Sequence, residues 1–353
     1  MKVLALTRYG SSGASSRLRI VQYVPLLRGM GITVTVAPLL RENYLARLNA
    51  GLGPHWPAIF ADYIARLRIL FNLRQFDLVW IEKELFPSLP AWIEFLLFRA
   101  GVKYVVDYDD AIFHQYDQSV HPLKKLLRRK IDNVMRNAST VVCGNDYLAK
   151  RADAAGAHKI VIIPTVIDLR RYVPREPDSK LQCVIGWIGS PTTSKYLDMV
   201  APALQTLAKE FSIKLVVVGA KFDLAGIQVD CLEWSEQTEV DHISTFDIGI
   251  MPLDDSPWER GKCGYKLIQY MACGRPVIAS PVGVNVDLVK NDMNGYLANS
   301  TAEWLVALRK LLDSSELRCR LGHAGRRLVE EQYTLQKTVA CLATTLRDAK
   351  VAS

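Results

Sequence analysis

The sequence predicts an α/β fold with two domains, and three observations support this prediction. The chain has 353 residues, which exceeds one ordinary domain and suits two domains that are each large enough for a hydrophobic core. Short apolar runs alternate with longer runs of helical period, which favours parallel sheets covered by helices on both faces. Hydrophobic residues make up 50% of the chain and charged residues 23%, as in a globular protein.

The first half of the chain contains six short runs that we interpret as strands. They are 3–7, 32–36, 78–81, 104–107, 140–143 and 160–163. The first run is too short, and too soon followed by Arg8 and glycines, for a secretory signal. The sequence has no run of about 18 uncharged apolar residues, so we expect no membrane-spanning helix.

A change of pattern near Pro164 predicts the boundary between the two domains. A polar stretch that contains Pro174 and Pro177 follows it, and such a composition is typical of a linker. We therefore expect an N-terminal domain at residues 1–168 and a C-terminal domain at residues 169–333. Apolar runs at 184–188, 215–219, 247–252 and 277–280 are the strands expected in the second domain.

The segment between two of these strands has the features of an anion site. The apolar strand 247–252 leads through a polar loop into a short helix that begins near Gly264, and Lys262 and Lys266 flank this glycine. Because a helix start offers unpaired N–H groups and the positive end of a dipole, this turn suits a diphosphate. The alternative is that Gly264 is an ordinary turn residue and both lysines are solvated.

The same segment resembles the donor-nucleotide loop of retaining glycosyltransferases of the GT-B fold, in particular glycosyltransferase family 4. That family carries a glutamate, seven residues, a second glutamate and then a Met-Ala-x-Gly-x-Pro-Val run, which residues 271–277 fit. Gly261 and Gln269 stand at the two glutamate positions. The resemblance implies a GT-B fold, in which two Rossmann-like domains with parallel sheets face each other across a cleft. It also implies that the C-terminal helix, here 334–353, packs back on the N-terminal domain.

The resemblance further implies that a nucleotide-sugar donor binds the C-terminal domain and that a glycan or lipid-linked acceptor binds the N-terminal domain, with retention of configuration. Gln269 would bond the ribose, and Glu259 or Lys262 would replace the missing glutamate. Lys195, Lys262 and Lys266 would stabilise the departing nucleoside diphosphate. The full set of expected donor-binding residues is Gly13, Gly189, Ser190, Lys195, Trp234, Glu259, Lys262, Cys263, Gly264, Tyr265, Lys266 and Gln269.

Three of these positions have a second interpretation. By resemblance Gly13 would leave room for the donor, but the loop that contains it also reads as an ordinary turn into a helix. Ser190 stands where family members carry an arginine, and its hydroxyl would cap the following helix equally well. Trp234 would line the pocket for the nucleotide base or belong to the core.

Carboxylates follow one expected strand of the N-terminal domain, where α/β sheets build their sites. Asp107 and Asp109 have the Asp-x-Asp spacing that binds a divalent metal in the other glycosyltransferase fold. Alternatively, Asp109 and Asp110 accept the proton of the attacking hydroxyl or position the sugar, unless one of them caps the turn. The expected second α/β domain favours this alternative, because a chain of the other glycosyltransferase fold would not need it. We expect neither metal nor cofactor, and Asp109, Asp110, Lys195 and Lys266 as catalytic residues.

The net charge of +8 permits anionic partners. Residues 51–75 read as an amphipathic helix with Arg66, Arg68 and Arg74 on a basic face, and residues 121–130 hold five cations. Such helices are either solvated or lie on an anionic membrane surface as peripheral contacts. Nucleic acid is not an expected partner, because no recognised nucleic-acid-binding module accompanies the charge.

The cysteine pattern favours the cytoplasm, at the inner face of the membrane if the basic helices bind lipid. Seven cysteines without a Cys-x-x-Cys pair indicate neither a metal site nor a disulfide framework. Two other classes of function stay open. Gly261 and Gln269 fit a catalytically silent subunit that binds a nucleotide-sugar. A dinucleotide-dependent oxidoreductase is disfavoured, because the loop after the first strand lacks the third glycine and the acidic partner of the dinucleotide fingerprint.

Overall fold

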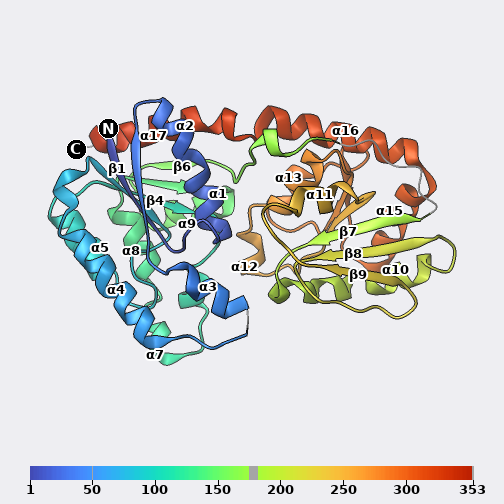
Figure 1. Cartoon of the computed structure of the whole chain (residues 1–353), viewed down its shortest axis with the longest axis horizontal. Coiled ribbons are helices and arrows are strands. Elements are labelled where there is room, and N and C mark those ends of the chain that lie inside the picture. Colours follow the sequence, from blue (N-terminus) through green and yellow to red (C-terminus); the bar gives the residue numbers. More distant parts are fainter. Residues whose placement is uncertain (50, 175–181, 352–353) are drawn as a thin grey trace. The chain divides into compact units, whose positions relative to one another are not determined.

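The computed structural model describes residues 1–49, 51–174 and 182–351, and these form two compact units (Figure 1). The first unit contains Met1–Thr165, Gly261–Cys263 and the chain from Leu335 onward. The second contains Val166–Arg260 and Gly264–Thr334. Pro177 of the predicted linker lies outside the described residues. Within the described ranges, no helix combines the length and the apolar character needed to cross a bilayer.

A six-stranded parallel sheet forms the centre of the first unit, and all six predicted strands are confirmed. They are β1 (Lys2–Thr7), β2 (Thr33–Pro38), β3 (Leu78–Glu82), β4 (Tyr104–Tyr108), β5 (Thr140–Cys143) and β6 (Ile160–Ile162), in the order β2-β1-β3-β4-β5-β6. Every residue of β3 and β4 is buried, as expected for central strands covered on both faces. Because all strands are parallel, their carboxyl ends meet at one edge of the sheet.

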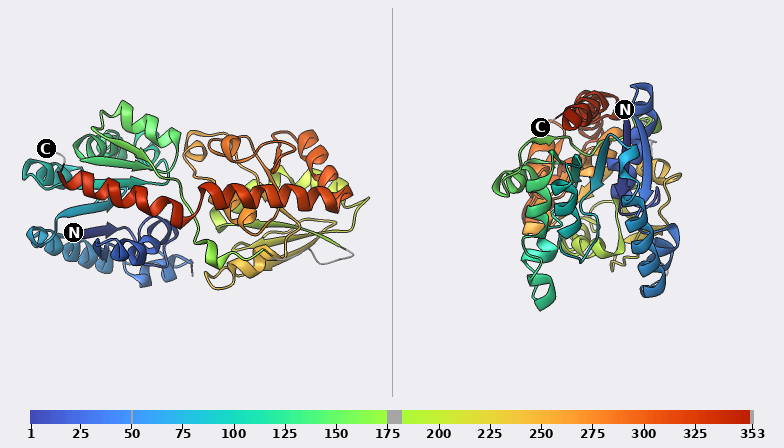
Figure 2. Two further views of the ribbon diagram at one scale, coloured as in Figure 1. Left: turned by 90° about the horizontal axis from the view of Figure 1, so that it is seen from above. Right: turned by 90° about the vertical axis from the view of Figure 1, so that its left-hand side faces the viewer.

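Helices connect these strands, and the last helix of the chain belongs to this unit. They are α1 (Ala14–Arg19), α2 (Val24–Gly29), α3 (Glu42–Asn49), α4 (Trp56–Leu70), α5 (Trp92–Arg99), α6 (His114–Asp117), α7 (Pro122–Lys125), α8 (Lys130–Asn137), α9 (Asp146–Ala154) and α17 (Leu335–Val351), with 3-10 turns η1 (Val21–Tyr23) and η2 (Leu73–Gln75). Helix α17 packs against β3, β4 and α2 (Figure 2). The hydroxyls of Tyr23 and Thr338 are 2.8 Å apart, and Lys350 Nζ lies 3.0 Å from the carboxylate of Asp77.

The predicted basic amphipathic helix is α4, but the exposure of Arg66, Trp56 and Phe60 is the reverse of the expectation, whereas Arg68 is exposed as predicted. Arg66 is 1% exposed, and its Nη2 atom donates to the carbonyls of Thr7 (2.6 Å) and Ala37 (2.9 Å). Burial lowers the pKa of Arg66 to about 10. Trp56 and Phe60 are instead 70% exposed. The buried carbonyls at the ends of β1 and β2 need a donor, which explains why the arginine points inward.

The continuous basic helix expected at 121–130 is also wrong. Helix α7 ends after four residues, and α8 begins only at Lys130. Leu123 and Leu126 are 68% and 81% exposed, so a longer helix here would bury no apolar face to stabilise it. Lys130, one of the five cations, is buried in an ion pair with Glu84.

A second six-stranded parallel sheet forms the centre of the second unit. Its strands are β7 (Cys183–Ile188), β8 (Ile213–Val218), β9 (Gln228–Leu232), β10 (Ile248–Met251), β11 (Val277–Ala279) and β12 (Gly295–Leu297), in the order β12-β11-β10-β7-β8-β9. Its two faces carry separate apolar cores, one with Leu267 and Tyr270 and the other with Trp187 and Trp304. The predicted α/β class with two parallel sheets is confirmed.

The helices of the second unit are α10 (Ala201–Leu207), α11 (Glu239–Ser244), α12 (Pro257–Arg260), α13 (Tyr265–Ala272), α14 (Asn285–Leu288), α15 (Thr301–Asp313) and α16 (Ser315–Gln332), with 3-10 helices η3 (Leu169–Arg171) and η4 (Pro191–Met199). The capping box of Ser300 and Glu303 starts α15 as predicted. The run of helical period after β7 is split between η4 and α10. Pro202 lies in the first turn of α10, where its missing N–H is tolerated.

Candidate functional site

Two glycine turns lie side by side at the carboxyl ends of β7 and β8. Gly189 follows β7 and donates its N–H to the carbonyl of Val218 at 3.0 Å. Gly219 follows β8 with φ +86, and a Cβ at this position would lie 2.4 Å from the carbonyl oxygen of Gly189. Both the left-handed backbone and the close approach require glycine at position 219. The turns therefore let the side chains of Lys266, Trp187 and Trp234 come close to the main chain at this edge of the sheet.

Lys266 brings a cation to these turns. It is the second residue of α13, and its Nζ lies 4.2 Å from the centre of the Trp187 ring. A Cβ at Gly189 would lie 2.5 Å from the same Nζ atom. The ammonium group is thus held over an indole face, at a glycine turn and beside a helix start. This combination of a cation, a helix start and glycine turns is typical of phosphate sites.

Tyr270 fixes the orientation of α13 relative to the sheet. Its hydroxyl accepts the N–H of Ile188 at 2.9 Å, and its ring packs where a Cβ at Gly249 would come within 2.5 Å. At the start of the helix, Gly264 has φ +65, and a Cβ there would lie 2.3 Å from Leu288. The sequence pattern around Gly264 therefore serves the fold as well as the site, because only glycine fits this position.

Both carboxylate oxygens of Glu259 accept hydrogen bonds within the second unit. Glu259 is 8% exposed, the hydroxyl of Tyr196 donates to its Oε1 at 2.5 Å, and the hydroxyl of Ser256 donates to Oε2. The Tyr196 hydroxyl thereby connects η4 to α12, and Ser256 directly precedes α12. Hydrogen bonds to both carboxylate oxygens satisfy the buried charge, as burial requires.

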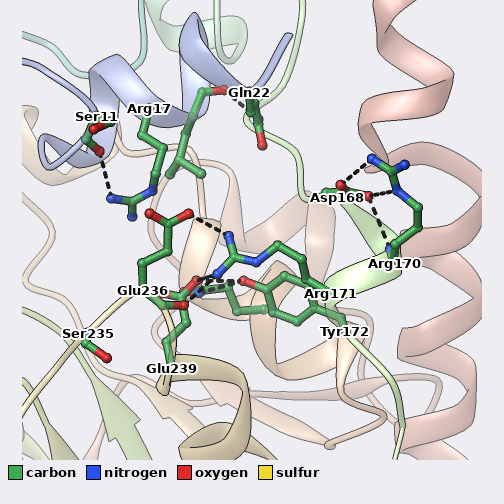
Figure 3. Close-up of polar contacts among 12 residues, drawn as sticks. Ser11, Arg17, Gln22, Asp168, Arg170, Arg171, Tyr172, Ser235, Glu236 and Glu239 are labelled. Atoms are coloured by element: carbon green, nitrogen blue, oxygen red, sulfur yellow. Dashed lines mark hydrogen bonds and ion pairs between the residues drawn. The ribbon is translucent and has the colours of Figure 1, made fainter. Parts of the chain in front are cut away.

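A polar cluster around Glu239 joins η3, α11 and α13, and Figure 3 shows its central part. Glu239 is 2% exposed and accepts from Tyr172 (3.3 Å), from Arg171 (3.3 Å) and from the indole N–H of Trp234 (3.1 Å). Gln269, which is 3% exposed, donates its amide to the Tyr172 hydroxyl at 3.0 Å. The cluster therefore fixes the side chain of Gln269 from within the unit.

In the first unit, Asp107 forms a buried ion pair with Arg19. Arg19 Nε donates to Asp107 Oδ1 at 2.7 Å, and both side chains are 2% exposed. Arg19 also donates to the carbonyl of Ile163 at 2.8 Å. Burial opposes the charge of Arg19, but the Asp107 carboxylate outweighs this and raises the pKa of Arg19. Asp107 is thus neutralised by an arginine of α1.

Asp109 and Asp110 follow β4 and share a second cation. Nζ of Lys83 lies 2.8 Å from Oδ1 of Asp109 and 3.5 Å from Oδ2 of Asp110. Burial raises the pKa of Asp109, but the Lys83 charge and hydrogen bonds outweigh it, and the pKa lies below its ordinary value. At Asp110, burial together with the charge of Asp109 prevails over Lys83 and raises the pKa. Asp110 is therefore the better proton acceptor of the pair.

The segment Gly261–Cys263 belongs to the first unit and packs on the loop after β4. Asn145 Nδ2 donates to the carbonyls of Gly261 and Lys262, both at 3.0 Å, and Cys263 Sγ lies 3.1 Å from the carbonyl of Asp109. A Cβ at Gly261 would lie 2.4 Å from the Cβ of Ala111. This position has no room for a glutamate, which is a physical reason for the departure from the expected pattern.

Two domain families match the chain. The family described as "Glycosyl transferase 4-like domain" matches residues 22–165, and the family described as "Glycosyl transferases group 1" matches residues 182–314. The chain belongs to glycosyltransferase family 4. The predicted resemblance is confirmed.

The three similar proteins described next share no more than 23% sequence identity with this chain. A curated relative is the GDP-mannose-dependent α-(1-6)-phosphatidylinositol dimannoside mannosyltransferase of Mycobacterium tuberculosis, 23% identical over 228 residues. The match covers 60% of this chain and 58% of that protein. Among solved structures, sucrose-phosphate synthase of Thermosynechococcus elongatus has a TM-score of 0.74 at 15% identity, covering 100% of both chains. Anabaena Alr3699/HepE, solved with UDP, has a TM-score of 0.72 at 16% identity, covering 99% of this chain and 100% of that one. These structures share the GT-B fold.

The predicted donor residues of this chain are divided between the units. Gly13, Lys262 and Cys263 lie in the first unit, with Asp109 and Asp110. The second unit holds the others, which are Gly189, Ser190, Lys195, Trp234, Glu259, Gly264, Tyr265, Lys266 and Gln269. Within it the structure brings Lys266 to Gly189, and it brings Gln269 and Tyr265 to the hydroxyl of Tyr172.

Several predicted donor residues of the family member make local contacts. The interpretation of the Ser190 hydroxyl as a helix cap is wrong, because it makes no capping bond at the start of η4 and lies instead 2.9 Å from the hydroxyl of Thr192. Lys195 is exposed on the same helix. Position 13 requires glycine for steric reasons, since a Cβ there would lie 2.5 Å from the Cβ of Tyr9. Trp234 is 39% exposed, so the interpretation of Trp234 as a core residue is wrong.

Three residues at these sites were not predicted from the sequence, namely Lys83, Trp187 and Glu239. A signal for Lys83 exists, because Glu82-Lys83-Glu84 directly follows a buried strand, and charged residues at that place in a parallel sheet lie at the edge where sites form. Trp187 lies inside an apolar strand and Glu239 inside a polar stretch. Neither position carries a recognised motif, because each acquires its role from a contact across the fold.

Proposed function

We propose that this chain transfers a sugar from a nucleotide-sugar to an acceptor hydroxyl, with retention of configuration. The observation that carries the proposal is the position of Lys266, whose Nζ lies over Trp187 at the Gly189 turn. A cation beside a glycine turn and a helix start stabilises the diphosphate that leaves the donor sugar. The two named neighbours of this chain that act on GDP-mannose or were solved with UDP support a nucleotide-sugar as the donor.

The first unit is proposed to supply the proton acceptor. The acceptor hydroxyl must lose a proton as it attacks the sugar, and a carboxylate near neutral pH receives it. Asp110 has the raised pKa of the pair and 30% exposure of its side chain, against 12% for Asp109. We therefore assign proton transfer to Asp110 and a positioning role to Asp109.

We propose that the reaction needs no metal. Arg19 already pairs with Asp107 and Lys83 with Asp109, so the two carboxylates of the Asp-x-Asp spacing face cations of the protein. A divalent ion would have to compete with both charges. Within the described parts of the chain, no group of three His, Cys, Asp or Glu side chains is placed to hold a metal.

Thermal shift against UDP-, GDP-, dTDP- and ADP-sugars, followed by a transfer assay, tests the function. A ligand at about 100 times its Kd stabilises a protein by about 2.7 kcal/mol, so we expect one nucleotide class to raise Tm by several degrees. Transfer is expected to persist in excess EDTA. Binding without turnover on a broad acceptor set would favour the silent subunit instead. Activity lost in EDTA and restored by Mg²⁺ or Mn²⁺ would favour a metal at Asp107 and Asp109.

We also propose that the acceptor is lipid-linked and that the first unit lies on an anionic membrane. Trp56, Phe60 and Trp92 of α4 and α5 are 70–72% exposed, and Arg68 and Arg99 on the same helices are exposed. Aromatic and cationic side chains together are typical of helices at a membrane surface. The exposed aromatic residues, rather than the expected basic faces, carry this proposal.

We expect the double substitution Trp56→Ser and Phe60→Ser to weaken binding to anionic vesicles at least about fivefold, because it removes two aromatic anchors. Co-sedimentation with phosphatidylglycerol–phosphatidylcholine vesicles measures this. Val306→Ser is the matched control, since Val306 is an exposed apolar residue (58%) of the second unit. Wild-type binding should fall as salt rises. If the wild type does not sediment with anionic vesicles, the membrane proposal fails.

A further inference from the structure

Lys83 has an unusual backbone conformation for a residue with a side chain. It is the first residue after β3, and its φ is +65, in the left-handed region that favours glycine. Its N–H donates to the carbonyl of Asp107 at 3.0 Å, which continues the ladder between β3 and β4. Strained residues of this kind persist where the surrounding structure holds them, and they concentrate at functional sites.

The side chain of Lys83 connects three segments of the chain. Its Nζ lies 2.8 Å from Asp109 Oδ1, 3.5 Å from Asp110 Oδ2 and 3.0 Å from the hydroxyl of Ser15 in α1. The lysine side chain is only 7% exposed. The ammonium group has three N–H donors, and one oxygen each of Asp109, Asp110 and Ser15 lies close enough to accept. The left-handed backbone turns the side chain from the end of β3 toward the loop after β4.

Several other charged groups lie near the carboxyl pair, and some of them are bonded to other partners. The groups that face the pair are Lys83, Arg19, Lys262, Asp107, Glu82 and Cys263. Arg19 is bonded to Asp107, and Glu82 accepts from Ser16 (2.6 Å) and from the N–H of Arg8 (2.8 Å). Lys83 contacts both Asp109 and Asp110, and the charge of Lys262 also lowers the pKa of Asp110.

We propose that Lys83 is a positioning residue that binds Asp109, aligns Asp110 toward the acceptor and joins both carboxyls to Ser15 in the first turn of α1. This proposal rests on the proposed transferase function, because it assigns the pair to the acceptor side of that reaction. In the resting site, the ammonium neutralises Asp109 and leaves Asp110 to receive the proton. Lys83 itself keeps its protons, since the two aspartates raise its pKa in spite of burial.

Lys83→Met tests the proposal, because methionine keeps the length of the side chain and removes the charge. We expect kcat to fall at least 100-fold, with KM for the donor changed less than about twofold because the proposed diphosphate site lies in the second unit. Without the cation, the pKa of both carboxyls rises, so the acid limb of the kcat–pH profile should move up by about one pH unit or more. Lys83→Arg keeps the charge and should restore the position of that limb.

Lys130→Met is the matched control. Lys130 is also a buried lysine of the first unit, paired with Glu84 and with the carbonyl of Phe86. Its loss should lower Tm, as the loss of Lys83 does, but it should leave the acid limb in place. If Lys83→Met does not fold, Lys83→Gly removes the same charge and relieves the backbone strain at φ +65. A Lys83 variant that is folded and keeps both kcat and the acid limb would overturn the proposal.

Carboxyl NMR separates this proposal from the proposed function. In protein labelled with ¹³C at the aspartate carboxyl, the titration of Asp110, assigned with Asp110→Asn, should shift to higher pH in Lys83→Met. This readout needs no substrate. A chain that transfers no sugar, with a titration that shifts as expected, would reject the proposed function and keep the link between Lys83 and Asp110. A titration of Asp110 that does not shift would reject the role of Lys83.

Discussion

Lys266→Ala is expected to weaken the binding of the donor nucleoside diphosphate at least tenfold, which corresponds to about 1.4 kcal/mol or more. The ammonium of Lys266 lies over the Trp187 ring and against the Gly189 turn, where it would meet the charge of the proposed diphosphate directly. Isothermal titration calorimetry with the nucleotide selected by thermal shift measures the change. The loss should be smaller at high salt, because screening weakens the interaction that the substitution removes.

Lys310→Ala is the control for Lys266. Lys310 also lies in the second unit with its Nζ over an aromatic ring, 4.9 Å from the centre of Tyr296, but it is on α15. Its removal deletes the same kind of cation–π contact and should leave nucleotide affinity within twofold. An affinity of Lys266→Ala equal to that of the wild type would refute the phosphate site at Gly189.

Asp110→Asn is expected to lower kcat by about 10²- to 10⁴-fold, the range for removal of a general base. The amide keeps the shape of the carboxyl but accepts no proton at neutral pH. The pKa of Asp110 is raised above the ordinary value of 3.8, and the charged form is the active one. Wild-type activity should therefore fall as pH decreases through this raised pKa, and Asp110→Asn should lose that limb. Steady-state kinetics over pH measures both effects.

Asp117→Asn is the matched control for Asp110. Asp117 is another partly exposed aspartate of the first unit, 3.0 Å from Arg151 and 2.8 Å from His114. Its substitution should reduce stability at most slightly and leave kcat within threefold. A folded Asp110→Asn variant with kcat within threefold of the wild type would remove Asp110 from the reaction.

The sheets were predictable because their strands are buried on both faces. A strand such as β3 or β4 is a run of apolar residues with a single carboxylate near its end, Glu82 or Asp107, and that signal needs no knowledge of neighbours. The start of α13 was predictable for a similar reason, since Gly264 is the residue whose φ of +65 requires glycine. Local chemistry decides both features, so the sequence displays them.

The surface of the first unit was not predictable in the same way. Periodicity places Arg66 on a polar helix face, yet buried carbonyls of Thr7 and Ala37 draw it inward, while Trp56 and Phe60 remain exposed. Those carbonyls lie at the ends of two strands far away in sequence. A pattern within one helix does not contain the hydrogen-bonding needs of another segment.

The sequence by itself determined the α/β class, the six strands of the first sheet, four strands of the second, the family and the glycine turn before α13, because each depends on burial or backbone conformation encoded within a few residues. Only the tertiary structure decided that Lys83 contacts Asp109 and Asp110, that Arg19 contacts Asp107, and that Glu239 orders the surroundings of Gln269. The partners in each of these contacts come from separate segments of the chain. Their distances depend on how the strand ends and loops pack, so their chemistry exists only in the folded chain.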